Sequence, residues 1–284
     1  MSTRLIGASA DSVEAATAPL RALDLPPRPR NRARNGLAIA AFALFTIATC
    51  VPAIGGIEVD LGALVRNWSN GSGLLVQLIQ PDFSFLPRTL EPILETLQMA
   101  LVGAAAAALV SVPLTLWAAA PTNPNGVTRH AVRTVINVLR AVPDLVYATV
   151  LVAMIGVGAL PGLVTLFLFN VGVVVKLVSE AIDSGDHAYM EAGRAAGGSQ
   201  LQINRATALP QSWPLFANQW LYALELNVRI SAILGIVGAG GIGRLLDERR
   251  AFYAYDDVAI IVLEILVVVV LIELVSTTLR RRLV

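Results

Sequence analysis

The feature that most constrains this chain is a run of 31 residues without a charged side chain, which lies between Asp144 and Lys176. At a rise of about 1.5 Å per residue, the run is too long for one untilted membrane crossing. Gly156, Gly158 and Pro161 interrupt it and predict a tight hairpin. The run therefore indicates two consecutive helices in a lipid bilayer.

The composition of the whole chain also indicates an integral membrane protein. Hydrophobic residues make up 56% of the chain and charged residues 14%, whereas a soluble domain carries about 25% charged residues. The net charge of +1 gives no sign of nucleic-acid binding. The single cysteine, Cys50, excludes an intrachain disulfide and is interpreted as a buried thiol.

Six apolar segments are long enough to cross a membrane as helices. The predicted crossings cover residues 37–57, 90–120, 134–156, 160–182, 209–237 and 258–279. Residues 1–36 precede them and are interpreted as a flexible cytoplasmic arm, since they are too long and too polar for a cleavable signal. Residues 37–89 comprise the first crossing and an outer amphipathic segment, and residues 90–284 form the main membrane domain.

The distribution of arginine predicts how the chain is oriented. Thirteen arginines lie in residues 1–36, 121–133, 183–208 and in the tail after residue 279. The opposite set of loops holds five, namely Arg66, Arg88, Arg244, Arg249 and Arg250. Because basic residues concentrate on the cytoplasmic side of a membrane protein, both termini are predicted to be cytoplasmic.

One cytoplasmic loop contains a polar, alanine-rich stretch, EAGRAAGGSQLQINRATALP, from Glu191 to Pro210. Asp186 can cap a helix over about residues 187–196, and Gly197 can end it. The alanines keep one side of this helix thin, and Glu191 offers a charge to a basic partner. The pattern predicts a short helix that lies across the cytoplasmic face and transmits force from a partner to the membrane helices.

The same stretch resembles the cytoplasmic loop of ABC importer permeases, which carry the pattern E-A-A-x3-G-x9-I-x-L-P. Five of its seven positions match, at Glu191, Ala192, Gly197, Leu209 and Pro210. Gly193 replaces the second alanine and Thr207 replaces the isoleucine. The resemblance implies a coupling helix within residues 187–200 that docks in a cleft of a separate ATPase subunit. Its predicted contact residues are Tyr189, Glu191, Ala192, Gly193, Ala196 and Gly197.

Two further segments, LRAVPDLVYA at 139–148 and ELNVRISAILGIVGAGGIG at 225–243, resemble the phosphonate importer permease. This resemblance covers roughly residues 90–284 and implies an all-α integral membrane protein with six transmembrane helices and the type I ABC importer permease (MetI-like) fold. It also implies a homodimer in the bacterial inner membrane, with two ATPase subunits and an extracytoplasmic substrate-binding protein. The implied cargo is a phosphonate, or phosphate or phosphite in some members.

The chain lacks the residues that its own ATP site or active site would need. Its only lysine, Lys176, has no glycine loop before it, whereas a P-loop places a lysine directly after such a loop. ATP and Mg are therefore expected on the partner ATPase, with no cofactor on this chain. His130 and His187 are solitary, and no Ser–His–Asp arrangement is recognised, so neither a metal site nor a catalytic residue is predicted.

Three pairs of opposite charges lie four residues apart in or near the predicted crossings. The pairs are Arg140/Asp144, Lys176/Glu180 and Glu225/Arg229. One interpretation is that they neutralise each other within a helix. The other is a translocation path for an anion, in which arginine contacts the phosphonate oxygens and the acids keep binding weak. The predicted path residues are Arg140, Asp144, Glu225, Asn227 and Arg229.

Four glycines follow the fifth predicted crossing, at Gly238, Gly240, Gly241 and Gly243. Three of them spell the G-x-G-x-x-G of a dinucleotide loop, but no βαβ unit surrounds them. An outer gate, or a contact with the binding protein, suits their position better. Replacing Gly240 with valine is then expected to reduce transport without loss of assembly.

Two other functions stay open on the residues alone. A proton-coupled secondary transporter would use the intramembrane carboxylates Glu225, Glu264 and Glu273, although no inverted repeat is found. A permease for another small solute, such as methionine, would share the glycine-rich segment.

Overall fold

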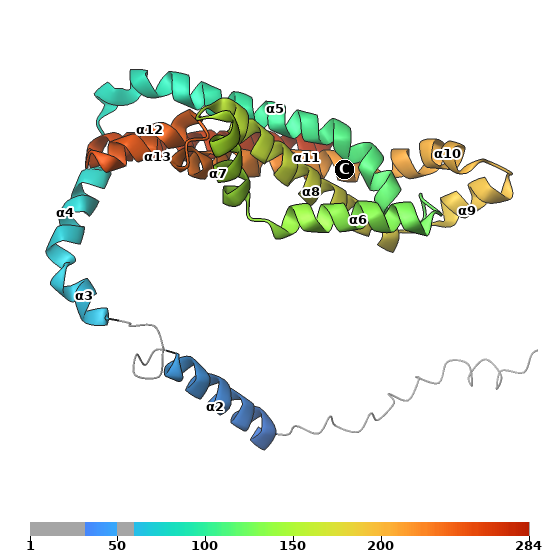
Figure 1. Cartoon of the computed structure of the whole chain (residues 1–284), viewed down its shortest axis with the longest axis horizontal. Coiled ribbons are helices and arrows are strands. Elements are labelled where there is room, and N and C mark those ends of the chain that lie inside the picture. The colour runs from blue at the N-terminus through green and yellow to red at the C-terminus, as the bar shows by residue number, and fades with distance from the viewer. Residues whose placement is uncertain (1–31, 50–59, 284) are drawn as a thin grey trace, which may run out of the picture. The chain divides into compact units, whose positions relative to one another are not determined.

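The computed structural model describes residues 32–49 and 60–283, and every element within those ranges is helical (Figure 1). Residues 1–31 of the predicted arm and residues 50–57 of the first predicted crossing, including Cys50, lie outside the described residues. The described part of that crossing forms α2, Arg32–Ala48, whose leucine, isoleucine and phenylalanine side chains are exposed. An exposed apolar helix of this kind is suited to lipid.

The segment predicted as one outer amphipathic helix forms two helices. Helix α3 covers Leu61–Arg66 and is capped by Asp60, whose carboxylate accepts the Ala63 N–H at 3.1 Å. Helix α4 covers Trp68–Ile79 and packs against the last helix of the chain. A 3₁₀ turn, η2 (Phe83–Phe85), then buries the Phe85 ring at the start of the main bundle.

Two long helices, α5 (Leu86–Ala118) and α8 (Ala159–Ser184), form the closest pair in the bundle. Small residues permit this approach: a Cβ atom on Gly103 would lie 3.2 Å from the Leu166 Cβ. Ala104 and Ala107 are buried on the same side of α5. Such small-residue contacts are typical of helix packing in membranes, where they let two backbones lie close together.

The predicted crossing over residues 134–156 is not one continuous helix. The structure instead has α6 (Gly126–Ala141) and α7 (Asp144–Ile155), whose axes differ by 86°. Pro143 explains the corner, because a proline pushes the preceding residue out of the helical region. Val142 accordingly has extended backbone angles, φ −86° and ψ 125°.

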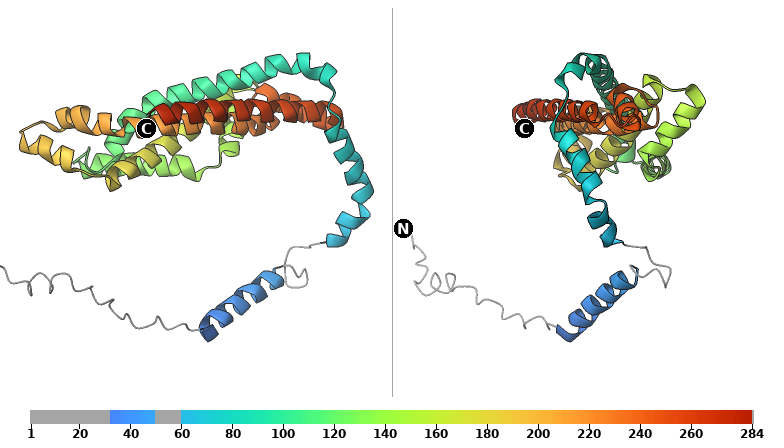
Figure 2. Two further views of the ribbon diagram at one scale, coloured as in Figure 1. Left: turned by 180° about the vertical axis from the view of Figure 1, so that it is seen from behind. Right: turned by 90° about the vertical axis from the view of Figure 1, so that its left-hand side faces the viewer.

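The C-terminal half is built on α11 (Leu209–Ile236), which packs against α5, α8, α12 (Gly241–Ala251) and α13 (Tyr255–Leu283). Its buried side chains Phe216 and Ala223 meet Val174 and Val178 of α8 in one core cluster. Figure 2 shows α13 running along the length of the bundle. Helix α11 is therefore the central support of this half.

Among the described residues, three segments are long and apolar enough to cross a membrane: Phe83–Ala118, Ala159–Ser184 and Tyr255–Arg282. Two bent helix pairs, α6 with α7 and the segment Gln200–Ile236 with α12, raise the number to five if each pair is one span. Large apolar side chains cover the outside of the bundle, as at Leu101 and Leu109 of α5. This surface suits a bilayer and agrees with the all-helical membrane fold predicted from the sequence.

Candidate functional site

The polar loop after α8 forms a compact helical unit at the end of the bundle opposite α12 (Figure 1). It consists of α9 (Ala188–Ala195), α10 (Gln200–Ile203) and the π-helical turn η3 (Asn204–Ala208), which leads into α11. The Asp186 carboxylate accepts the Ala188 N–H at 2.9 Å, and Gly197 ends α9 with φ +80°. The positive φ of Gly197 was expected from the residue type, whereas the N-cap position is His187, so Asp186 supports the first turn from one residue before it.

One side of α9 packs into the protein. Met190 is buried with Ile203, Ala208 and Leu116, which joins α9 to α10, η3 and α5. A Cβ atom on Gly193 would lie 3.2 Å from the Ile203 Cγ1, so the short side chain permits this contact. Gly193 is thus half-buried against α10 and does not face outward like its predicted companions.

The opposite side of α9 is open. Tyr189 is 63% exposed, and Glu191, Ala192, Ala196 and Gly197 are exposed as well. All five of these predicted contact residues are therefore exposed, and they comprise one large aromatic ring, one carboxylate and three small residues. A partner can approach the backbone closely at these small residues.

Three side chains tie this unit to the loop between α5 and α6, and nothing in the sequence pattern indicated them. Arg194 and Gln200 donate to the Pro121 carbonyl at 2.9 and 3.1 Å. Asn204 donates to the Thr122 carbonyl at 2.8 Å. Because these bonds span more than 70 residues of chain, only the folded structure reveals that the unit is fixed to α5 as well as to α8 and α11.

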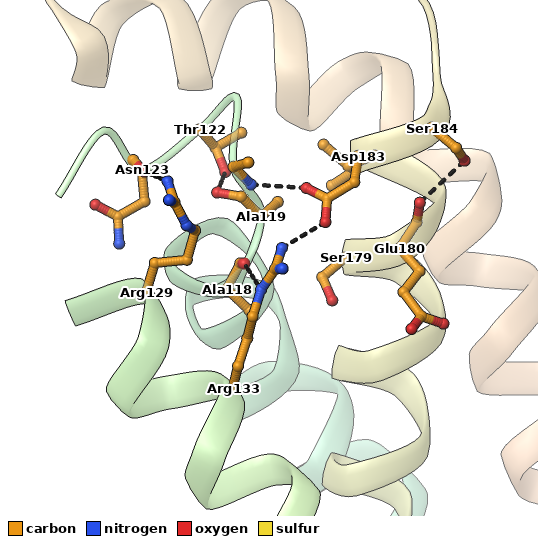
Figure 3. Close-up of polar contacts among 12 residues, drawn as sticks. Ala118, Ala119, Thr122, Asn123, Arg129, Arg133, Ser179, Glu180, Asp183 and Ser184 are labelled. Atoms are coloured by element: carbon orange, nitrogen blue, oxygen red, sulfur yellow. Dashed lines mark hydrogen bonds and ion pairs between the residues drawn. The ribbon is translucent and has the colours of Figure 1, made fainter. Parts of the chain in front are cut away.

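A second junction, drawn in Figure 3, joins the ends of α5, α6 and α8. Asp183 accepts the Ala120 N–H at 2.7 Å and forms an ion pair with Arg133. The Arg133 Nε in turn donates to the Ala118 carbonyl at 2.7 Å. Together the two junctions link the α9 unit, through side-chain contacts, to α5, α6, α8 and α11.

Of the predicted path residues, Arg140 and Asp144 lie together. They flank the corner between α6 and α7 and line a cavity of about 270 Å³ with Tyr147, Phe169 and Val173. The stem of Arg140 packs over Gly172, where a Cβ atom would lie 2.9 Å from the Arg140 Cγ. Neither charge forms an ion pair within the described residues, so both are available to a ligand in this cavity.

The other predicted path residues lie elsewhere. Glu225 is paired with Arg280 of α13 at 2.6 Å, and Arg229 with Glu273 of α13 at 3.7 Å. The predicted pair within α11 is therefore wrong, because α13 supplies a nearer opposite charge to each member. Asn227 is fully buried and donates to the Ala100 carbonyl at 2.9 Å, so it holds α11 against α5. Arg229 is 48% exposed and remains open to a ligand.

The third predicted pair, Lys176 with Glu180, forms as expected at 2.7 Å along one face of α8. The structure also gives Glu273 a partner, which the sequence had not indicated. One carboxylate oxygen of Glu264 is buried without a hydrogen-bond partner in the described residues.

The glycines after α11 form a closely packed junction. Gly158 donates to the Gly238 carbonyl at 3.0 Å, and the Glu95 carboxylate accepts the Gly241 N–H at 3.1 Å. Thr96 accepts the Ile242 N–H at 2.8 Å, which completes the first turn of α12. The loop is thus bonded to both α5 and the start of α8.

The packing leaves no room for side chains at Gly240, Gly241 and Gly243. A Cβ atom on Gly240 would lie 2.9 Å from the Ala159 nitrogen, and one on Gly243 would lie 2.1 Å from the Ala232 oxygen. Gly240 also has φ +80°, which L side chains rarely adopt. The expectation that valine at Gly240 spares assembly is therefore not supported, since the substitution disturbs the packing itself.

Within the described ranges, no group of three or more His, Cys, Asp or Glu side chains is placed to hold a metal ion.

Residues 111–284 match the family described as binding-protein-dependent transport system inner membrane component. The chain belongs to this family of permease subunits of ABC importers. It is 38% identical over 222 residues to the phosphite transport system permease protein PtxC of Stutzerimonas stutzeri, covering 78% of this chain and 81% of that protein. It is 34% identical over 266 residues to the phosphate-import permease protein PhnE of Mycolicibacterium smegmatis, covering 93% of this chain and 50% of PhnE, so it spans half of that protein's length.

A solved structure of the MetNI methionine ABC transporter has the same fold. The TM-score is 0.65 at 21% identity, and the match covers 72% of this chain and 99% of that chain. This likeness confirms the predicted type I (MetI-like) importer permease fold. An amino acid ABC transporter structure matches more distantly, with a TM-score of 0.55 at 18% identity over 80% of this chain and all of that one.

Family membership settles several predictions. The chain is a multi-pass inner membrane protein and a transport subunit, and ATP hydrolysis belongs to a separate chain. The family also implies an ATPase and a substrate-binding protein as partners. The alternative of a proton-coupled secondary transporter receives no support.

Proposed function

We propose that this chain forms the translocation path of an ATP-driven importer for phosphonate or a related phosphorus oxyanion such as phosphite or phosphate. The observation that supports this cargo is the 38% identity to the phosphite permease PtxC, which extends over 81% of that protein. The names of the mycobacterial PhnE and of a second Stutzerimonas stutzeri protein, HtxC, refer to phosphate and phosphite. A methionine permease matches less closely, at 29% identity.

The transporting unit in this proposal is a homodimer. One copy offers a cavity beside α6 and α7 that is open on one side, and a two-fold axis would place the same surface of a second copy against it. Both termini face the cytoplasm, in accordance with the excess of arginine in residues 1–36, 121–133, 183–208 and after residue 279.

The exposed face of α9 is the proposed contact with the ATPase. Tyr189, Glu191, Ala192, Ala196 and Gly197 form this face, with Gly193 setting the distance between α9 and α10. The bonds from Arg194 to Pro121 and from Asp183 to Arg133 support a rigid connection to the membrane helices. Closure of the two ATPase subunits would move α9 and the attached ends of α5, α6 and α8 as one body.

Arg140 and Arg229 are the proposed anion contacts along the path. A guanidinium group can form two parallel hydrogen bonds with phosphonate oxygens. Asp144, in the same cavity as Arg140, would keep the complex weak enough for release, as a transport path requires. No cofactor is proposed for this chain, and ATP and Mg would bind to the partner ATPase.

The test is transport in reconstituted vesicles that contain this chain, its co-purified ATPase and its substrate-binding protein. Labelled phosphite and methylphosphonate should enter the vesicles only with ATP, and orthovanadate should stop the uptake. Labelled methionine is the matched control and should not enter. Uptake of methionine in place of the phosphorus compounds would contradict the cargo, and uptake by this chain alone would contradict the coupling role.

A further inference from the structure

Helix α12 ends in a backbone conformation that is unusual for the residue found there. Tyr253 has φ +58°, and it is the non-glycine residue with positive φ in the described part of the chain. The Tyr253 N–H donates to the Arg250 carbonyl and the Ala254 N–H to the Arg249 carbonyl, each at 3.1 Å. This is the position after a helix where glycine is usual, because a Cβ atom crowds the backbone in this conformation.

The Tyr253 ring makes little contact with the rest of the described chain, so side-chain packing offsets little of this strain. The Tyr253 side chain is 77% exposed, and the neighbouring Phe252 is 73% exposed. Tyr253 lies edge-on to Tyr255, with ring centroids 6.3 Å apart. We call Phe252, Tyr253 and Tyr255 the aromatic tip. Strain that persists at an exposed side chain points to a role outside the folded chain.

The aromatic tip is held firmly by the rest of the molecule. Glu95 and Thr96 of α5 bond the first turn of α12. At its other end, the Arg249 guanidinium lies over the Phe85 ring, 4.9 Å from the centroid, and 3.6 Å from the Asp257 carboxylate. Because these contacts already fix α12, the aromatic tip loses little conformational freedom when it binds a partner.

The charges around the aromatic tip suit a protein partner better than a membrane surface. Segments that bind anionic lipid are rich in Lys and Arg. Here residues 244–257 carry four carboxylates and three arginines. Arg250 pairs with Asp247 at 2.7 Å and Arg249 with Glu248 at 3.3 Å. Exposed aromatic rings within a rim of both charges are typical of the centre of a protein–protein interface.

We propose that the aromatic tip docks the substrate-binding protein on the outer face of the importer, with Tyr253 and Phe252 inserted into a pocket of that protein. This rests on the proposed function, since the orientation given there places residues 244–257 outside the cell. Figure 1 agrees with that side, because α12 lies at the end of the bundle opposite the α9 unit. The tip would thus receive the loaded binding protein at one end while α9 meets the ATPase at the other.

The decisive variant is Y253G, because glycine removes the ring and also the backbone strain. In the reconstituted complex, Y253G should leave the unfolding midpoint unchanged or raise it. The concentration of phosphite-loaded binding protein that half-maximally stimulates ATPase activity should rise about tenfold, the effect of losing one interface anchor. F252A should shift it in the same direction. Y253F keeps the ring and should stay within about twofold of the wild-type value.

Several outcomes would overturn the proposal. If the binding protein stimulates wild type, Y253G and F252A equally, the tip is not its docking site. If brominated lipid in the vesicles quenches a fluorophore that replaces Phe252, the rings belong to the membrane interface. If no binding protein stimulates the wild-type complex, the proposed function itself fails.

Discussion

The Arg280 Nη2 lies 2.6 Å from the Glu225 Oε1 and joins the end of α13 to the middle of α11, across 55 residues of chain. The Glu225 side chain is only 10% exposed. An isolated charge at such a position is unfavourable in a membrane protein, so each group requires the other. The pair therefore fixes how α13 lies against the central helix.

Removing one member of this pair should destabilise the protein strongly. We expect R280A to lower the free energy of unfolding by about 3 to 5 kcal/mol, because it leaves the buried Glu225 carboxylate without its partner, and E225A to cost less, because the Arg280 side chain is 30% exposed. The double variant E225L/R280L should lose much less, since no charge remains. Denaturant unfolding in detergent micelles measures all three.

The exposed pair Lys176 and Glu180 provides the control. K176A should change the free energy of unfolding by about 0.3 to 0.5 kcal/mol, the usual value for such a pair on a helix surface. Equal losses for R280A and K176A would show that burial does not determine the importance of the Glu225–Arg280 pair.

The conformation of Gly197 should control how well α9 couples to the ATPase. Its φ of +80° favours glycine, and no atom lies near enough to hinder a Cβ sterically. G197A should therefore cost about 1 to 2 kcal/mol through strain alone, and transport per ATP hydrolysed should fall. Transport per ATP hydrolysed should fall less in G197N, because asparagine tolerates this conformation. Equal transport by G197A, G197N and wild type would remove any role of this turn in coupling.

Removing the Asp183 carboxylate should lower the stability of the protein as well as the coupling of α9 to the membrane helices. D183A leaves the Arg133 guanidinium and the Ala120 N–H without their acceptor. We expect a loss of about 1 to 2 kcal/mol, discounted because Arg133 is partly exposed. D183N, which retains an acceptor for Ala120, should lose less. Thermal unfolding of the two variants side by side separates the hydrogen bond from the charge.

Replacing the small residues between α11 and α12 with larger ones should destabilise the protein. A Cβ atom on Gly243 would lie 2.1 Å from the Ala232 oxygen, so G243A should lower the yield of folded complex and cost about 1 to 3 kcal/mol. G126A is the matched control at the exposed start of α6, where a Cβ atom meets only the end of the Arg129 side chain. Well-folded G243A would show that α11 and α12 can separate easily.

Substitutions of Arg140 and Arg229 should lower the uptake of the anion without reducing assembly of the complex. We expect R140A to lower uptake of phosphite about tenfold, which corresponds to the loss of about 1.4 kcal/mol of interaction with the anion. R140K should recover part of the rate, because it restores the charge but not the bidentate geometry. Unchanged uptake by both R140A and R229A would mean that the anion follows another route.

The sequence determined those features that depend on neighbouring residues. Long apolar runs identified α5, α8, α11 and α13, because the bilayer requires about 20 apolar residues for each crossing. Asp186 and Gly197 marked the ends of α9, since capping and positive φ are properties of single positions. Matches at five positions of the coupling motif identified the family from one loop.

The tertiary structure alone decided which charges meet between different helices. Spacing of four residues predicted Glu225 with Arg229, but α13 brings Arg280 and Glu273 closer to them. Spacing also predicted Arg140 beside Asp144 on one helix, whereas a corner at Pro143 places both around a cavity. A short-range pattern cannot weigh partners that lie about 50 residues away, because helix packing sets those distances and an ion pair forms wherever the opposite charge is nearest.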